Sequence, residues 1–185
     1  MIEPREIQIV VMAYREEPNR HLQAWLNGLC RRGYEWRYGP ETHPVYVARN
    51  QVVNRFLAED TMKQHLVMID APLVPIQDQT VRVLTEPGEV VYCGYVGRYG
   101  TPGHCGTFGC GCFRASRRVY EAAPPPWFDF GYDATLTQKT ECECQRFARR
   151  LAEPPRQVGI VGRLSEMILV PCADGTPRAI SPHEI

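Results

Sequence analysis

The sequence HLVMIDAPLVP, residues 65–75, contains the pattern on which the expected architecture depends. Its apolar run at residues 66–69 is typical of a buried strand, and the run stops abruptly at Asp70. Pro75 then begins a stretch with helical character that continues to about Leu84, because proline is well tolerated in the first turn of a helix. This order predicts one strand–helix unit of an α/β protein.

The same alternation extends to both sides of this stretch. An apolar run at residues 7–13 precedes a predicted helix over residues 22–30, whose large side chains recur with i, i+3, i+4 spacing. A short strand at 35–38 then leads to a second helix over 48–57, and residues 90–95 form a further strand. Repeated units of this length predict a mostly parallel sheet with helices on both faces.

The second half of the chain is less regular. We expect a glycine-rich loop over residues 97–112 that enters a buried strand, and short helices over 116–122 and 141–151. We expect a long loop at 127–140, and two short strands at 158–161 and 167–170. No internal repeat or low-complexity segment is present, so residues 1–185 are predicted to form a single domain.

Composition excludes several classes of function. The 185 residues include 21 Lys and Arg and 21 Asp and Glu, which gives a formal net charge of zero. A neutral chain lacks the excess of positive charge by which proteins bind nucleic acid or an anionic membrane without specificity. No apolar run is long enough to span a bilayer, and the acidic N-terminus MIEPREIQIV does not resemble a secretory signal. We therefore expect a cytoplasmic protein.

Asp70 is the first candidate for a functional side chain. In open α/β sheets, ligands bind outside the carboxyl ends of the strands. Residues 14–19 and 70–75 are expected at that edge, because each segment directly follows a predicted strand. The alternative is that Asp70 is a capping or turn aspartate, which is common at the end of a strand.

Five segments, in the same order along the chain, resemble the GT-A glycosyltransferases, in particular the family 2 type and its short phage and bacterial relatives. These segments are IVVMAYREE (9–17), VARNQVVNRFL (47–57), HLVMIDAPLVP (65–75), FGCGCFRASRRVYE (108–121) and PPWFDFGYD with TECECQRFARR (125–133 and 140–150). Each motif is loose by itself, but the ordered set is more specific and spans roughly residues 7–161. The resemblance implies a GT-A-like, Rossmann-like α/β fold.

The resemblance also implies transfer of a sugar from a nucleotide diphosphate donor to an acceptor that the sequence does not identify. The implied donor-binding residues are Ala13, Tyr14, Arg15, Glu16, Arg49, Asn50 and Asp70. Asp70 would be the first carboxylate of the DxD motif, facing the ribose and a diphosphate bridged by Mn²⁺ or Mg²⁺. The acid near the end of the family's Glu-Asp pair is the general base that removes the proton of the acceptor hydroxyl.

Three positions depart from the family pattern. The chain has Asp70-Ala71-Pro72 in place of DxD, Glu141-Cys142 in place of Glu-Asp, and Ile160 where a histidine is common. These changes favour weakened or absent metal chemistry, since all three fall at the expected metal and base site. Glu141 is then the best candidate for the base, and Asp133 lies near it in sequence. The alternative to an enzyme is a binding or structural module that kept the fold and lost the chemistry.

An enzyme without a metal needs other cations near the diphosphate, and arginine matches phosphate oxygens well. The second half of the chain offers Arg98, Arg114, Arg117, Arg118, Lys139 and Arg163. Most of these side chains are expected to be ordinary surface charges.

The eight cysteines are the unusual feature of the composition. A zinc site built from cysteines and His104 would stabilise an interaction domain, which is a third possible function. The candidate zinc ligands are Cys105, Cys110, Cys112, Cys142 and Cys144. The spacing C-x-C is shorter than that of most zinc sites, and cysteine is commonly a buried core residue. Reduced core thiols are therefore the main expectation, with zinc and disulfides as alternatives.

Overall fold

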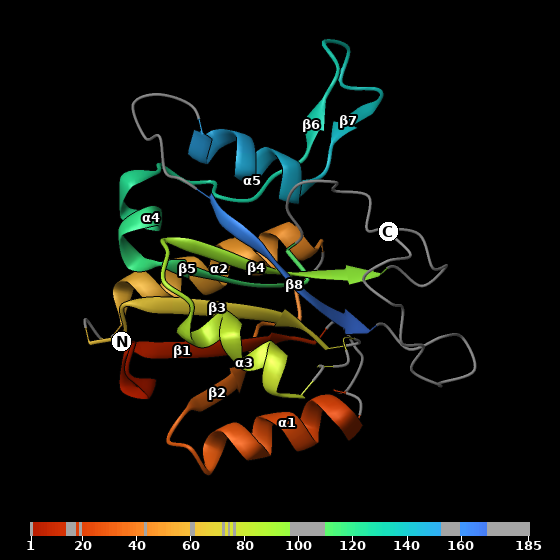
Figure 1. The fold of residues 1–185 in the computed structure, drawn as a ribbon. Helices are drawn as coiled ribbons and strands as arrows, with labels where there is room; N and C mark the ends of the chain where they lie inside the picture. Colours follow the sequence, from red (N-terminus) through yellow and green to blue (C-terminus); the bar gives the residue numbers. More distant parts are fainter. Residues whose placement is uncertain are drawn as a thin grey trace.

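The computed structural model describes residues 2–13, 18, 20–42, 44–59, 62–71, 73, 75, 77–96, 110–152 and 160–169. The centre of the fold is a six-stranded sheet (Figure 1). Its strands lie in the order β2 (Glu35–Tyr38), β1 (Ile7–Met12), β3 (His65–Asp70), β5 (Cys112–Ser116), β4 (Val90–Val96) and β8 (Ile160–Leu169). β1 is parallel to β2 and β3, β4 is parallel to β8, and β5 runs antiparallel to both of its neighbours. The predicted α/β architecture with a mostly parallel sheet is confirmed.

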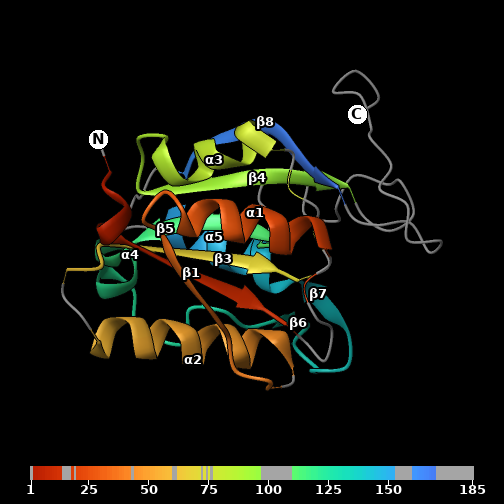
Figure 2. The ribbon, with the colours of Figure 1, turned by 90° about the horizontal axis from the view of Figure 1, so that it is seen from below.

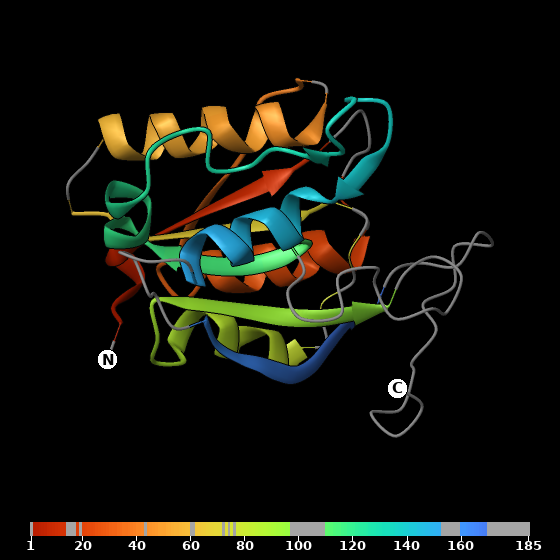
Figure 3. The same ribbon diagram turned by 90° about the horizontal axis from the view of Figure 1, so that it is seen from above.

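Helices cover both faces of this sheet. They are the 3₁₀ turn η1 (Pro4–Glu6) and the α-helices α1 (Arg20–Cys30), α2 (Val45–Ala58), α3 (Gln77–Thr85), α4 (Arg117–Ala122) and α5 (Glu143–Ala152). One hydrophobic cluster joins α1 and α3 to the sheet, and the other joins α2, α4 and α5 to the opposite face. Figure 2 shows α1 across one face, and Figure 3 shows α5 across the other.

The two-sided core explains why the first strands are continuous apolar runs. Successive side chains of a strand point to opposite faces of the sheet. Ile9 of β1 therefore packs in the cluster with α1 and α3, whereas Val10 packs in the cluster with α2. In β3 the same alternation divides Val67 from Met68. A sheet with both faces covered selects apolar residues at every position of its central strands.

Three predicted boundaries in the second half were wrong. Part of the expected loop at 127–140 forms a hairpin of β6 (Gly131–Tyr132) and β7 (Lys139–Glu141). α5 begins at Glu143 because Glu141 pairs with Gly131 in that hairpin. One continuous strand, β8, takes the place of the two expected short strands. It pairs with β4 in parallel, and the register of this pairing shifts at two points. Residues 158, 159 and 170 of those predicted strands lie outside the described residues.

Two of the six basic residues, most of which were expected at the surface, are buried in the fold. Arg114 of β5 is 0% exposed and donates to the carbonyl oxygens of Leu84 at the end of α3 (2.8 Å) and of Glu86 and Gly88 in the turn that follows it (3.1 Å for Gly88). These hydrogen bonds to backbone acceptors that are remote in sequence explain why a charged side chain is buried in the middle of the sheet.

Arg117, the other buried arginine, begins α4 and fastens it to the end of α2. Its guanidinium donates to the carbonyl oxygens of Phe56 (2.8 Å), Leu57 (3.2 Å) and Lys63 (3.0 Å), and it lies 4.6 Å from the centroid of the Phe56 ring. The neighbouring Arg118 does match the expected surface charge, since its side chain is 86% exposed.

Within the described ranges, no helix combines the length and the apolar character needed to cross a membrane.

Candidate functional site

Asp70 is the last residue of β3, at the carboxyl edge of the parallel strands. It lies opposite Met12 in the β1–β3 ladder, and its backbone N–H donates to the carbonyl oxygen of Gly111 at 2.8 Å. The side chain is 26% exposed. The strand therefore holds the backbone of Asp70 while its carboxylate remains partly accessible at the sheet edge where ligands bind in this class of fold.

Arg49 of α2 binds the Asp70 carboxylate directly. One nitrogen, Nη2, lies 2.9 Å from Oδ1 and 3.2 Å from Oδ2, and Nη1 donates to the carbonyl oxygen of Cys110 at 2.9 Å. Arg49 is only 2% exposed, so this ion pair is shielded from solvent on the arginine side. The sequence analysis placed both residues in one donor-binding set, and the structure brings them together. That analysis did not predict that the two side chains form an ion pair with each other.

The environment of Asp70 changes its titration. Burial raises the pKa of this carboxyl to about 6, and the nearby Cys144 and Glu143 act in the same direction. Arg49 opposes the shift without cancelling it. At neutral pH the carboxylate is mostly ionised, and it becomes largely neutral within about one pH unit below 6.

The raised pKa predicts a pH-dependent stability. Between about pH 4 and pH 6 the native state binds more protons at Asp70 than the unfolded chain does, so this residue contributes stability that is lost as the pH rises. We expect the free energy of unfolding of the wild type, relative to Asp70→Asn, to fall by up to about 3 kcal/mol between pH 4 and pH 7. Urea unfolding of both proteins across this pH range measures the two free energies of unfolding. A difference between them that does not change with pH would contradict the raised pKa of Asp70.

The side chain of Asn50, next to Arg49 on α2, forms hydrogen bonds with backbone groups of the protein itself. Its Oδ1 accepts from the backbone N–H groups of Trp127 (2.9 Å) and Phe128 (3.1 Å). Its Nδ2 donates to the carbonyl oxygens of Tyr46 (2.8 Å) and Phe128 (2.6 Å). The amide thus fastens the segment before β6 to α2. The predicted role of Asn50 at the nucleotide is untested, and its described contacts are structural.

The other predicted donor-binding residues follow β1. Ala13 is half-buried directly after the strand. Tyr14, Arg15 and Glu16 lie outside the described residues.

Glu141, the candidate base, belongs to β7 and is held by arginines. Arg149 grips both of its oxygens, with Nε 2.9 Å from Oε1 and Nη2 2.9 Å from Oε2, and Arg146 Nη1 lies 3.7 Å from Oε2. A carboxylate in such a bidentate pair must leave its partner before it can accept a proton from a substrate. The described geometry therefore favours a structural role for Glu141.

Asp133, the second candidate base, closes the turn between β6 and β7. Desolvation alone would raise its pKa, but hydrogen bonds from the backbone of Thr137 and Gln138 and the hydroxyls of Thr135 and Thr137 leave it lowered. The same bonds explain why the segment forms a hairpin, since aspartate commonly accepts from backbone amides a few residues ahead.

The described residues beside Asp70 do not form a ready set of ligands for Mn²⁺ or Mg²⁺. Such a cation commonly binds one or two carboxylates together with waters and substrate phosphates, and here the Asp70 carboxylate already shares both of its oxygens with Arg49. In the part of the chain that the structure describes, no three His, Cys, Asp or Glu side chains come together as metal ligands. This also leaves the zinc alternative without a complete ligand set there, and His104 and Cys105 lie outside the described residues.

Two cysteines adjoin the Asp70 site in a way that sequence reasoning missed. Cys110 supplies the carbonyl group that Arg49 binds, and its backbone N–H donates to Sγ of Cys144 at 3.3 Å. The sequence signal was a cysteine in each of the last two motifs, which was interpreted in terms of core packing, zinc or disulfides without a specific pair.

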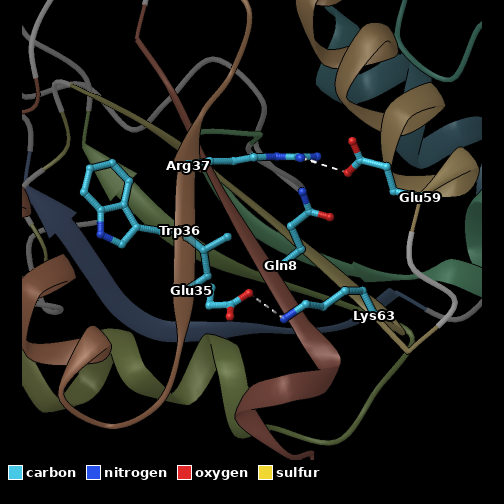
Figure 4. Close-up of a pocket in the computed structure, with 7 residues that line it drawn as sticks. Gln8, Glu35, Trp36, Arg37, Glu59 and Lys63 are labelled. Carbon is cyan, nitrogen blue, oxygen red and sulfur yellow. Dashed lines mark hydrogen bonds and ion pairs between the residues drawn. The ribbon is translucent and has the colours of Figure 1, made fainter.

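A separate hollow of about 470 Å³ lies over the first residues of β1 and β2 (Figure 4). Figure 4 shows two ion pairs beside Gln8, Arg37 with Glu59 at 2.8 Å and Lys63 with Glu35 at 3.3 Å. Gln8 lies opposite Leu66, four positions before Asp70 in the ladder. This hollow is therefore distinct from the Asp70 site, and its charged groups already neutralise one another.

Comparison with known proteins identifies a fold. No family model and no curated protein matches the chain. The crystal structure of A197 from STIV is similar with a TM-score of 0.55 and 15% identity, over 93% of this chain and 92% of that one. A glycosyltransferase involved in the glycosylation of the major capsid of PBCV-1 matches with a TM-score of 0.40 and 14% identity, over 65% and 69% of the two chains. The likeness to A197 supports the α/β fold alone, and the weaker match carries no argument.

Proposed function

We propose that the chain binds a nucleoside diphosphate sugar at the carboxyl edge of its sheet and transfers the sugar to an acceptor hydroxyl. The observation that carries the proposal is the partly exposed Asp70 carboxylate, held at the end of β3 by the buried Arg49. The ordered motifs of the sequence, which resemble the GT-A glycosyltransferases, support it. Asp70 would accept hydrogen bonds from the ribose hydroxyls, and Arg49 would fix the carboxylate in the orientation that this requires.

Binding is proposed to be independent of a divalent cation. Arg49 already neutralises Asp70, and the described residues offer no further set of oxygen ligands beside it. We expect the same affinity for a nucleoside diphosphate in the presence of Mn²⁺, of Mg²⁺ or of a chelator. A loss of affinity of tenfold or more in the chelator would contradict this part of the proposal.

Isothermal titration calorimetry with common nucleoside diphosphates and their sugars tests the donor site. Asp70→Ala is expected to weaken binding about 10- to 100-fold, the equivalent of ~1.5–3 kcal/mol for a hydrogen bond to a charged group. Glu121→Gln is the matched control, because Glu121 is an exposed carboxylate on α4. If no donor produces heat with the wild type, the proposal is wrong.

A binding module without transferase activity is the second candidate function. It is favoured by one observation: Glu141 and Asp133, the two candidate bases, are both occupied by contacts within the hairpin and α5. A donor-hydrolysis and transfer assay separates the two functions. Turnover that is lost in Glu141→Gln supports the enzyme, whereas tight donor binding with no turnover supports the module.

A further inference from the structure

Two pairs of cysteines lie close together in the described core. The backbone N–H of Cys110 donates to Sγ of Cys144 at 3.3 Å, and the neighbouring Cys93 thiol raises the pKa of Cys112. All four residues are buried, at 0% exposed for Cys93, Cys110 and Cys112 and 5% for Cys144. Cysteines that are paired across the fold in this way differ from isolated core thiols, because an exchange reaction can join each pair with little movement of the chain.

The Cys110–Cys144 pair lies beside the Asp70 site. Cys110 precedes β5 and provides the carbonyl group that accepts from Arg49 Nη1. Cys144 is in the first turn of α5, and its proximity is one of the causes of the raised pKa of Asp70. The two residues are 34 positions apart in sequence. A covalent bond between them would therefore fasten α5 to the strand end that holds the ion pair.

We propose that Cys110 and Cys144 are a modification site at which thiol–disulfide exchange with a small-molecule disulfide forms a reversible intramolecular disulfide. Sγ of Cys144 attacks one sulfur of the small disulfide, and a mixed disulfide forms as the first small thiol leaves with the proton of Cys144. Sγ of Cys110 then attacks the Cys144 sulfur, and the second small thiol leaves with the proton of Cys110. The two cysteines are oxidised, and one small disulfide is reduced to two thiols.

The order of attack follows from exposure. Cys144 is the more accessible member of the pair, and it lies near the N-terminus of α5, where negative charge on sulfur is stabilised. Burial, together with the hydrogen bond to Cys144, raises the pKa of Cys110 well above its usual value. Cys110 is therefore the thiol that completes the exchange, once the first step has brought an activated sulfur next to it.

The Cys93–Cys112 pair is an internal comparison. Cys93 is on β4 and Cys112 is on the neighbouring β5, both in the cluster that packs against α1 and α3, and neither has any exposed surface. Cys144 retains 5% exposure whereas this pair has none, so we expect selective oxidation of Cys110 and Cys144 in the folded protein.

The test is incubation of the folded, reduced 185-residue chain with oxidised glutathione, followed by alkylation and peptide mapping by mass spectrometry. We expect the number of titratable thiols to fall by two from the eight in the sequence, with one linked peptide that contains Cys110 and Cys144. Dithiothreitol should restore both thiols. Cys144→Ser should lose the link, whereas Cys93→Ser should retain it.

Cys142 provides the control for a neighbouring thiol. It is half-buried, two residues before Cys144, and its Sγ accepts from the backbone N–H of Gln145 at 3.5 Å. Cys142→Ser is expected to retain the Cys110–Cys144 link. A link through Cys142, or no linked peptide in the folded wild type, would overturn the proposal. Because this readout involves no nucleotide, its outcome is independent of the proposed donor binding.

Discussion

Replacement of Arg49 with methionine is expected to destabilise the protein by about 3–5 kcal/mol, because it removes the buried member of the ion pair and leaves the partly buried Asp70 carboxylate without its partner. Asp70 would lose its partner on α2, and the carbonyl oxygen of Cys110 would lose the donor that lies 2.9 Å away. Methionine fills a similar volume, so the loss reports the ion pair and hydrogen bonds more than a cavity. Urea unfolding at pH 7 measures the change.

Arg55→Met is the matched control for this variant. Arg55 lies on the same helix, its side chain is 64% exposed, and it pairs with Glu59 at i, i+4. Such a surface pair contributes only about 0.3–0.5 kcal/mol. If Arg49→Met costs no more than Arg55→Met, the buried pair has no structural role.

A double substitution separates the ion pair from the packing around it. Replacing both partners with apolar residues removes the unpaired charge as well as the attraction. We therefore expect Arg49→Met combined with Asp70→Leu to be more stable than Arg49→Met alone. An additive loss in the double variant would show that the two side chains do not act as a pair.

Arg114→Met is expected to cost a further ~3–5 kcal/mol in a different part of the fold. Arg114 is fully buried and donates to three carbonyl oxygens, one at the end of α3 and two in the turn between α3 and β4. Burial lowers the pKa of this guanidinium to about 10, so it stays charged at neutral pH. Its bonds are therefore charge-assisted, and each acceptor that is left unsatisfied in the core costs about 1–3 kcal/mol.

Arg118→Met tests the specificity of that loss. Arg118 lies four residues further along the chain, and its side chain is 86% exposed. Its Nη1 lies 3.8 Å from Oε1 of Glu89. We expect a change within about 0.5 kcal/mol for this surface position. Thermal or urea unfolding of the two variants should differ clearly, and equal losses would mean that the carbonyl contacts of Arg114 do not stabilise the turn.

Local patterns predicted the first half of the fold well. The runs at residues 7–13 and 66–69 became β1 and β3, and the helices expected over 22–30 and 48–57 became α1 and α2. These elements could be predicted because their apolar side chains repeat with the period of a strand or a helix. The hairpin of β6 and β7 was missed because it has only a few paired residues, and Asp133 fixes it through hydrogen bonds that leave no periodic pattern.

The roles of individual charges could not be predicted in the same way. The sequence alone does not distinguish an arginine that is exposed to solvent from one that is buried in the core. Arg114 is buried because the end of α3 and the turn that follows it present carbonyl oxygens 26 to 30 positions away in sequence. Only the packing of α3 beside β5 places those acceptors within reach.

In the candidate site, too, some features follow from the local sequence and others from tertiary contacts. By itself, the sequence determined that Asp70 ends a buried strand, since an apolar run followed by an acid is a local pattern. The tertiary structure alone decided what surrounds that carboxylate: Arg49 comes from 21 positions away, and Cys110 lies 61 positions from Arg49. The physical reason is that the sheet and its crossover helices bring remote segments to one edge, where burial and charge, rather than sequence spacing, determine which groups pair.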